Sequence, residues 1–332
     1  MHAESAESQL KGARALVTGG LGFIGSRLAL RLASLGAHVT VVDSMVPDTG
    51  ANDYHAQLLQ GRAVVRMADV RDEDAVSAAL TGQDFLFNLA ALVSHMDSMR
   101  EPFDDLDVNA RAQLTILDSI RQVNPGIRVL HASTRQVYGR ARSLPVNEDH
   151  PLRPPDVNGI NKLAGEGFFQ LYHDVYGVRG TVLRLTNTYG PGMRIRDGRQ
   201  TFLGIWLSSV LEGTRFAVWG GSQVRDLLFV EDVVDAFIAA ACTDSCVGQA
   251  YNVGRADGIS LRDLAELLTH VHGGGTYDVV PYPDDRRPIE IGDFVTDARK
   301  FAAATGWRAR VELQDGLRRT LAYYDEQRAN YL

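Results

Sequence analysis

The chain has 332 residues, of which 45% are apolar and 23% charged, and its 41 acidic and 34 basic side chains give a formal net charge of −7. This balance argues against nonspecific binding to nucleic acids or anionic membranes, which needs a basic face. No apolar run approaches the roughly 20 residues that span a bilayer, and the polar segment Met1–Gln9 is unlike a signal or transit peptide, so we expect a soluble cytoplasmic protein.

The first predicted element is a buried strand at residues 15–18 that leads into a glycine turn and then a helix. Gly19 permits the tight turn, Gly22 lets the backbone approach a pyrophosphate, and Gly25 lets the helix pack against the strand. The amide groups and dipole at the helix start favour an anionic phosphate. Because an apolar strand precedes the glycines and leucines follow at helical spacing, this context predicts a dinucleotide site.

A second apolar strand, at residues 37–42, ends in Asp43, about twenty residues after the turn. A carboxylate there would accept hydrogen bonds from the adenosine ribose hydroxyls and repel a 2′-phosphate. The sequence therefore predicts NAD rather than NADP, whereas a glycine turn that served packing alone would not explain Asp43.

Strand-like and helix-like segments alternate as far as about residue 190. The further strands expected in this region lie at 64–67, 85–89, 128–132 and 181–185. The alternation predicts an α/β fold with a Rossmann-type doubly wound parallel sheet. We expect an NAD-binding domain at residues 1–190 and a smaller C-terminal α/β substrate lobe at 191–332, interleaved with the first near the C-terminus. Within the lobe, Ser260 should cap a helix.

Two cysteines, Cys242 and Cys246, stand near the end of a predicted helix. They lack further cysteine or suitably spaced histidine partners, so we interpret them as small core residues. The sequence predicts no metal site.

Motifs along nearly the whole chain carry a resemblance to a known family. They are Thr18-Gly19-Gly20-x-Gly22-Phe23-Ile24-Gly25, Asp43, Asp69-Val70, Asn88-Leu89-Ala90-Ala91, Asn109, Ser133-Thr134, Val137-Tyr138-Gly139, Lys162, Leu183-Arg184-x-x-Asn187-x-Tyr189-Gly190-Pro191-Gly192, Arg225-Asp226, Tyr251-Asn252-Val253-Gly254 and Arg287-x-x-Glu290. The chain resembles the extended short-chain dehydrogenase/reductase superfamily, and within it the nucleotide-sugar epimerases and dehydratases.

The resemblance implies a role for each matching residue. Thr134 would bind the sugar hydroxyl that is oxidised, and Lys162 would bind the nicotinamide ribose. The cofactor-binding residues implied in this way are Gly19, Gly22, Phe23, Ile24, Gly25, Asp43, Ser44, Asp69, Val70, Leu89, Ala90, Ala91, Val93, Asn109 and Lys162.

One departure from the family concerns its catalytic tyrosine, which stands four residues before the lysine. Here that position is Asn158, and an amide cannot serve as a general base. Either another group takes the proton, with Lys162, His95 or Tyr189 as candidates, or the site binds NAD and a sugar nucleotide without ordinary hydride chemistry.

A second departure follows Thr134. Related dehydratases carry an acid and a glutamate at the next two positions, and this chain has Arg135 and Gln136. Neither side chain can exchange a proton usefully, which argues against elimination of water. Arg135 could bind a substrate carboxylate or phosphate, or it could pair with the acidic loop at Glu148-Asp149.

The C-terminal lobe should hold a nucleoside diphosphate. We expect Arg225 and Arg287 to clamp the pyrophosphate and Asn187 to position a phosphate or sugar oxygen. The remaining candidates are Phe202, Ala217 and Trp219 over the base and Glu290 at a ribose hydroxyl.

These residues favour NAD-dependent epimerisation of a nucleotide sugar, of the C4 type, through a transient ketone. The alternatives are an oxidoreductase or decarboxylase acting on a sugar uronate and a silent protein that binds NAD and a nucleotide sugar. The resemblance also implies a homodimer through helices at Pro102–Val123 and Gly159–Tyr176.

Overall fold

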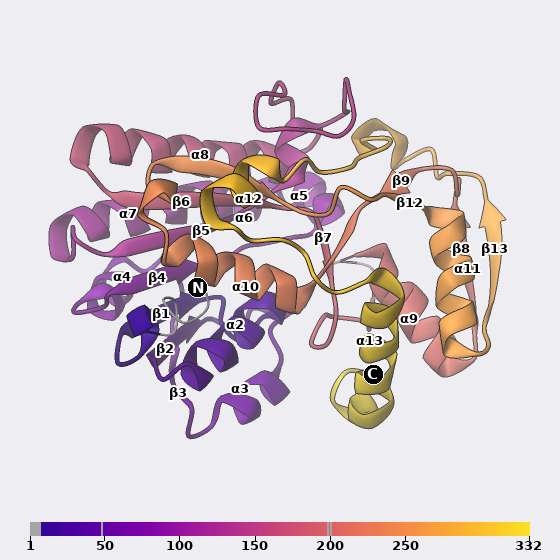
Figure 1. Cartoon of the computed structure of the whole chain (residues 1–332), viewed down its shortest axis with the longest axis horizontal. Helices are drawn as coiled ribbons and strands as arrows, with labels where there is room; N and C mark the ends of the chain where they lie inside the picture. The colour runs from indigo at the N-terminus through magenta and orange to yellow at the C-terminus, as the bar shows by residue number, and fades with distance from the viewer. Residues whose placement is uncertain (1–7, 48, 198, 200) are drawn as a thin grey trace.

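A computed structural model describes residues 8–47, 49–197, 199 and 201–332, so most of the polar segment Met1–Gln9 lies outside it. Its centre is a seven-stranded sheet with the order β11-β6-β5-β4-β1-β2-β3 (Figure 1). Every pairing in this sheet is parallel. The strands are β1 (Arg14–Thr18), β2 (His38–Asp43), β3 (Ala63–Met67), β4 (Phe85–Asn88), β5 (Arg128–Thr134), β6 (Arg179–Leu185) and β11 (Gln249–Val253).

Helices cover both faces of the sheet, as a parallel sheet requires. On one face, α2 (Phe23–Ser34) and α10 (Val230–Ala241) share a core in which Leu28 and Phe237 are buried. On the other face, α4 (Glu73–Leu80), α7 (Ala112–Val123) and α8 (Val157–Tyr176) pack around Ile116 and Phe169. The strand order reverses between β1 and β4, and ligands of such sheets bind at that switch point.

The helix expected over 102–123 is broken into segments. It consists of α6 (Pro102–Leu106), a π-helical turn η1 (Asp107–Arg111) and α7, and the short helix α5 (His95–Arg100) precedes it. The helix expected from Gly159 begins at Val157, because Asp156 caps it by accepting a hydrogen bond from the Gly159 amide at 2.7 Å. Both differences lie beside the predicted site.

The smaller lobe is built on β8 (Arg215–Trp219) and β13 (Thr276–Val280), which pair in parallel. Around them pack α9 (Phe202–Glu212), α11 (Leu261–His272) and α13 (Leu313–Gln327), with α3 (Asp53–Leu59) facing the lobe from the sheet side. Two further pairs are β7 (Asn187–Tyr189) with β10 (Leu227–Phe229) and β9 (Val224–Arg225) with β12 (Ile259–Ser260). The predicted cap of α11 is confirmed, since the Ser260 hydroxyl accepts from the Asp263 amide at 3.1 Å.

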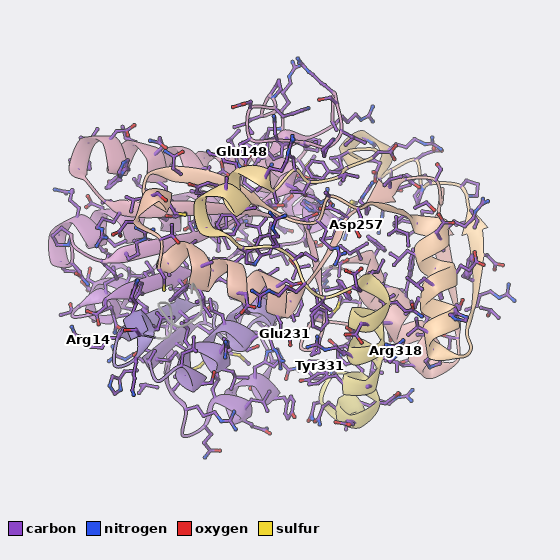
Figure 2. All side chains as sticks on the ribbon, viewed as in Figure 1. Arg14, Glu148, Glu231, Asp257, Arg318 and Tyr331 are labelled. Atoms are coloured by element: carbon purple, nitrogen blue, oxygen red, sulfur yellow. The ribbon has the colours of Figure 1, made fainter. Side chains whose placement is uncertain are left out.

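The chain crosses between the two parts more than once. After residue 190, α10, β11 and α12 (Arg299–Thr305) return to the sheet before α13 completes the lobe. Arg27 of α2 donates to the carboxylate of Glu231 of α10 at 2.7 Å and forms an ion pair with it. Near the C-terminus, the Tyr331 hydroxyl lies 2.7 Å from Nε2 of His55 in α3 (Figure 2). These contacts connect the lobe and its return segments to the sheet.

Three further observations concern the expectations from composition. Both cysteines are free thiols. Among the described residues, no helix is long and apolar enough to cross a membrane. In the same part of the chain, no three His, Cys, Asp or Glu side chains are grouped so that they could hold a metal ion.

Candidate active site

A cavity of about 230 Å³ opens at the switch point of the sheet. A Cβ on Gly25 would stand 2.2 Å from the Gly19 carbonyl oxygen, and Gly19 itself has a φ of +66°. The start of α2, at Gly22, has no side-chain cap, so its backbone amides remain for a ligand. Amide donors at a helix start suit the pyrophosphate of NAD. This geometry fits the glycine turn expected from the sequence.

Asp43 is held at the wall of this cavity. One of its carboxylate oxygens accepts from the Leu21 amide and the other from the Met45 amide, both at 2.9 Å. These bonds fix the carboxylate, while its remaining lone pairs are available to a ribose hydroxyl. Asp69 lines the same cavity, and a hydrogen bond from Arg71 outweighs burial to lower its pKa.

The other end of the cavity brings together Thr134, Asn158 and Lys162. Lys162 donates a hydrogen bond to the Ala132 carbonyl at 3.1 Å, and burial lowers its pKa to about 8. Of the predicted cofactor residues, Asn109 is absent from these walls. It lies in the π turn and donates to the Leu92 carbonyl at 2.9 Å, so it supports the wall from behind.

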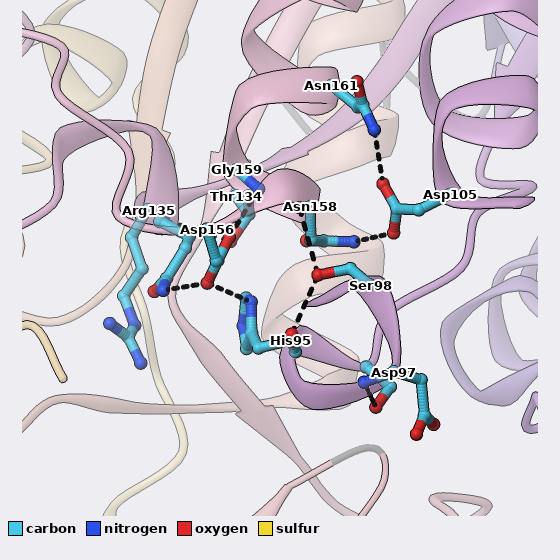
Figure 3. A network of polar contacts seen from close by, with 12 residues as sticks. His95, Asp97, Ser98, Asp105, Thr134, Arg135, Asp156, Asn158, Gly159 and Asn161 are labelled. Carbon is cyan, nitrogen blue, oxygen red and sulfur yellow. Dashed lines mark hydrogen bonds and ion pairs between the residues drawn. The ribbon is translucent and has the colours of Figure 1, made fainter. Parts of the chain in front are cut away.

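Asn158 anchors the surrounding segments (Figure 3). Its side-chain amide donates to the Leu92 carbonyl at 2.8 Å and to the Asp105 carboxylate at 2.9 Å. The second oxygen of Asp105 accepts from Asn161 at 2.9 Å, and Asp105 is only 1% exposed. Both hydrogens of the Asn158 amide are therefore engaged by the wall of the site, and the amide joins α8 to α6.

Beside Asn158, His95 faces a buried carboxylate (Figure 3). Its Nδ1 lies 3.0 Å from Oδ2 of Asp156, whose side chain is completely buried. Asp156 also accepts from the Gln136 amide and from the Gly159 backbone, each at 2.7 Å. Burial acts to raise the pKa of Asp156, but these contacts outweigh it and keep the pKa below its ordinary value.

Tyr189 does not belong to this site, so its candidacy as a base is corrected. It is 1% exposed, packs against Phe229 and donates to the Leu313 carbonyl at 3.3 Å. Burial raises the pKa of its phenol, and it lines neither cavity described here. The strand that carries it, β7, aims it into the core of the lobe.

A second cavity, of about 490 Å³, lies between the sheet and the lobe, and His95 lines both cavities. The predicted residues on its walls are Arg135, Gln136, Asn187, Phe202, Trp219, Arg225 and Glu290. Arg225 is paired with Glu290 and also donates to the Gly292 carbonyl. Glu290 in turn accepts from the Tyr282 hydroxyl at 2.7 Å.

Two predicted substrate residues lie away from these walls. Arg287 pairs with Asp284 at 2.8 Å with its side chain 61% exposed, while its neighbour Arg286 lines the cavity and stacks 4.4 Å from the Trp219 ring centre. Arg286 therefore takes the place of Arg287 in the site. Ala217 is exposed on β8, where its carbonyl accepts from Trp206.

Arg135 enters the second cavity as a buried cation. It donates to the Asn187 side chain at 2.9 Å, and its guanidinium lies 5.3 Å from the Phe294 ring centre. Its Nη1 is buried, and none of the described residues accepts a hydrogen bond from it. Burial and the nearby Arg225 lower its pKa to about 10. Glu148, which the sequence offered as an alternative partner of Arg135, accepts from the backbone amide of Asn252 instead.

Asp156, Asp105 and Arg286 are among the site residues that the sequence analysis missed. Asp156 carried a signal, since it stands three residues before Gly159 at the cap position of a helix. Asp105 carried no signal, because its partners Asn158 and Asn161 are distant in sequence. Arg286 carried none, because its position depends on the path of one loop.

The comparisons with known proteins agree with this geometry. The sequence profile of the NAD dependent epimerase/dehydratase family matches residues 15–254. A UDP-glucose 4-epimerase of Mycolicibacterium smegmatis is 30% identical over 318 residues, which cover 94% of this chain and 98% of the relative. A putative UDP-glucose 4-epimerase of Methanocaldococcus jannaschii is 28% identical over 309 residues, covering 92% of this chain and 96% of the relative.

A solved structure is similar over nearly its whole length. The UDP-glucose 4-epimerase of Thermotoga maritima, determined with UDP-glucose, matches with a TM-score of 0.85 and 28% identity, over 95% of this chain and 99% of that one. The Rossmann-type fold and the resemblance to the extended short-chain dehydrogenase/reductases are therefore confirmed. The chain is an enzyme of the NAD dependent epimerase/dehydratase family, with NAD as its cofactor.

Proposed function

We propose that this protein inverts the configuration at C4 of a nucleotide-diphosphate sugar. The observation that carries the proposal is the junction of the two cavities at His95, beside Thr134 and Lys162. A dinucleotide in the first cavity and a sugar nucleotide in the second would bring the nicotinamide and the sugar ring together there. When bound, NAD supplies the hydride acceptor. The names of the relatives from M. smegmatis and T. maritima support a 4-epimerase.

Arg135 and Gln136 favour epimerisation over dehydration. Gln136 is engaged with Asp156, and Arg135 is a cation without an exchangeable proton near neutrality. Epimerisation at C4 requires oxidation and reduction of one carbon and no acid for a leaving hydroxyl. The proposed reaction therefore uses the groups present at this junction.

A second candidate is a sugar that carries a carboxylate, such as a uronate. The buried Nη1 of Arg135 favours it, because a buried N–H group without an acceptor is costly and a carboxylate matches the planar fork of a guanidinium. Oxidation or decarboxylation of a uronate remains the alternative reaction.

The test incubates the purified protein and NAD with matched neutral and uronate sugars on several nucleoside diphosphates. Proton NMR of the products is expected to show inversion at C4, and Arg135→Gln should raise KM for the uronate more than for the neutral sugar. Release of carbon dioxide or net reduction of NAD would favour the alternative reaction. Tight binding without any product across the panel would overturn the proposal in favour of a silent binding protein.

We also propose a homodimer formed through α6, α7 and α8. Phe103 is 78% exposed, Ile160 54% and Val175 59%, and all three lie on these helices. A second copy would cover such apolar side chains. Light scattering should give twice the mass of the 36.3 kDa chain, and a charged residue in place of Val175 should shift the mass toward the monomer. The cytoplasmic location stays a prediction.

A further inference from the structure

We propose that His95, placed beside Asp156, is the acid–base group of this site. It would take the role that Asn158 cannot fill, because an amide does not exchange a proton near neutrality. This inference rests on the proposed function and names the group that exchanges the proton of the sugar hydroxyl.

Asp156 has the features of an orienting carboxylate. Its side chain is completely buried, and it receives hydrogen bonds from Gly159 and Gln136 in addition to the contact with His95. It also caps α8, whose positive N-terminal end favours the ionised form. A fixed negative charge is therefore placed 3.0 Å from one ring nitrogen of His95.

Nδ1 of His95 lies 3.0 Å from Oδ2 of Asp156, although the two do not form an aligned hydrogen bond in this structure and Nδ1 has no other acceptor among the described residues. A proton held on Nδ1 by this carboxylate would leave the lone pair on Nε2, which could then accept a proton from a substrate. His95 has a side chain 39% exposed and lines both cavities, so the ring stands where the cofactor and the sugar would meet. In hydrolases with a Ser-His-Asp triad, the aspartate likewise binds one ring nitrogen of the histidine, and the other ring nitrogen acts as the base.

The other polar groups near this junction are engaged elsewhere. The Asn158 amide is bound to Leu92 and Asp105, and the Lys162 ammonium donates to Ala132. Asp105 lines neither cavity. Thr134 can bind a hydroxyl but cannot take up a proton near neutrality.

The proposed step balances with NAD as the oxidant. The sugar C4–OH gives its proton to Nε2 of His95, and the C4 hydrogen leaves as a hydride to NAD, so a carbonyl forms. The imidazolium is stabilised by Asp156. Return of the hydride to the opposite face of the carbonyl, with return of the proton from Nε2, gives the epimer and regenerates the site.

Other charged residues line the two cavities that meet at His95. They are Asp97 and Arg100 of α5, Lys162 of α8, Arg135, Arg199, Arg225, Arg286, Glu290, Asp43 and Asp69. Asp156 is the carboxylate at contact distance, so its removal should dominate the effect on the ring.

The test compares His95→Asn with the matched control His270→Asn, which changes an exposed histidine on α11. An asparagine at position 95 can still reach Asp156 but has no basic nitrogen. We expect a fall in kcat of about 100-fold or more, with KM and the calorimetric affinity for NAD within about threefold of wild type. The pH profile of kcat should differ between the wild type and the variant, because only the wild type carries a proton-exchanging side chain at position 95.

A second measurement does not depend on turnover. Nitrogen NMR of the NAD complex should show the His95 ring with its proton on Nδ1, identified by its loss in His95→Asn, and Asp156→Asn should shift the ring toward the other tautomer. Asparagine also caps helices, so α8 should be retained in that variant.

The outcomes separate the two proposals. An active wild type whose His95→Asn variant keeps more than a tenth of kcat and the same pH profile overturns the role of His95 and leaves the proposed function standing. A proton on Nε2 in the wild type also overturns it. A wild type without turnover on any sugar nucleotide overturns both.

Discussion

Replacing Asp105 with alanine is expected to lower the free energy of unfolding by about 2–4 kcal/mol. Its two carboxylate oxygens accept from Asn158 and Asn161, both at 2.9 Å, and the residue is 1% exposed (Figure 3). Each buried donor that loses its acceptor costs about 1–3 kcal/mol. Two such donors give the expected range, with partial relief where water enters the vacated space.

The assay is equilibrium urea unfolding of wild type, Asp105→Ala and Asp105→Asn. The amide introduced by Asp105→Asn can present one acceptor, so this variant should lose roughly half as much stability. Asp104→Ala is the matched control, because Asp104 is exposed on the same helix α6, and it should cost about 0.5 kcal/mol or less. Equal losses at positions 104 and 105 would refute the anchoring role assigned to Asn158.

Three further predictions concern the cofactor site and the core. Gly25→Ala should weaken NAD binding at least about tenfold in calorimetry, because the new Cβ would stand 2.2 Å from the Gly19 oxygen; an unchanged affinity would contradict this. Lys162→Met should reduce NAD retained on purification, and full occupancy would remove its assigned role. Burial lowers the pKa of His55 from 6.5 to about 4, so its stability contribution is full above pH 6.5 and is lost as the pH falls toward 4, by about 3 kcal/mol. In urea unfolding at several pH values, His55→Gln should flatten this dependence, and an equally steep dependence in the variant would disprove it.

The parts of the fold that depend on local patterns could be predicted from the sequence. Apolar runs at β1, β2 and β5 are buried on both faces of the sheet, which makes their strands recognisable without tertiary information. The glycine turn and Asp43 follow from the same logic, because their spacing is tied to one strand–turn–helix unit. The cofactor cavity therefore contains nearly all the residues expected there.

The parts that depend on contacts between distant segments could not be predicted. His95 and Asp156 meet only because α5 packs beside the start of α8. Arg286 enters the second cavity in place of Arg287 because of a single 3-10 turn, η4 (Arg287–Ile289), which turns successive side chains to different sides. Tyr189 was placed near the site because its strand pointed there, but β7 pairs with β10 and buries the ring in the lobe.

In the proposed reaction, a hydrogen of the sugar leaves as a hydride and returns to the same carbon. The most direct test of this transfer is the reaction of a nucleotide sugar with the wild-type protein and NAD in D₂O, followed by proton NMR of the inverted product. The epimer should keep protium at the inverted carbon, because a hydride does not exchange with solvent. Deuterium at that carbon would contradict the proposed transfer, because inversion would then proceed by removal of a carbon-bound proton.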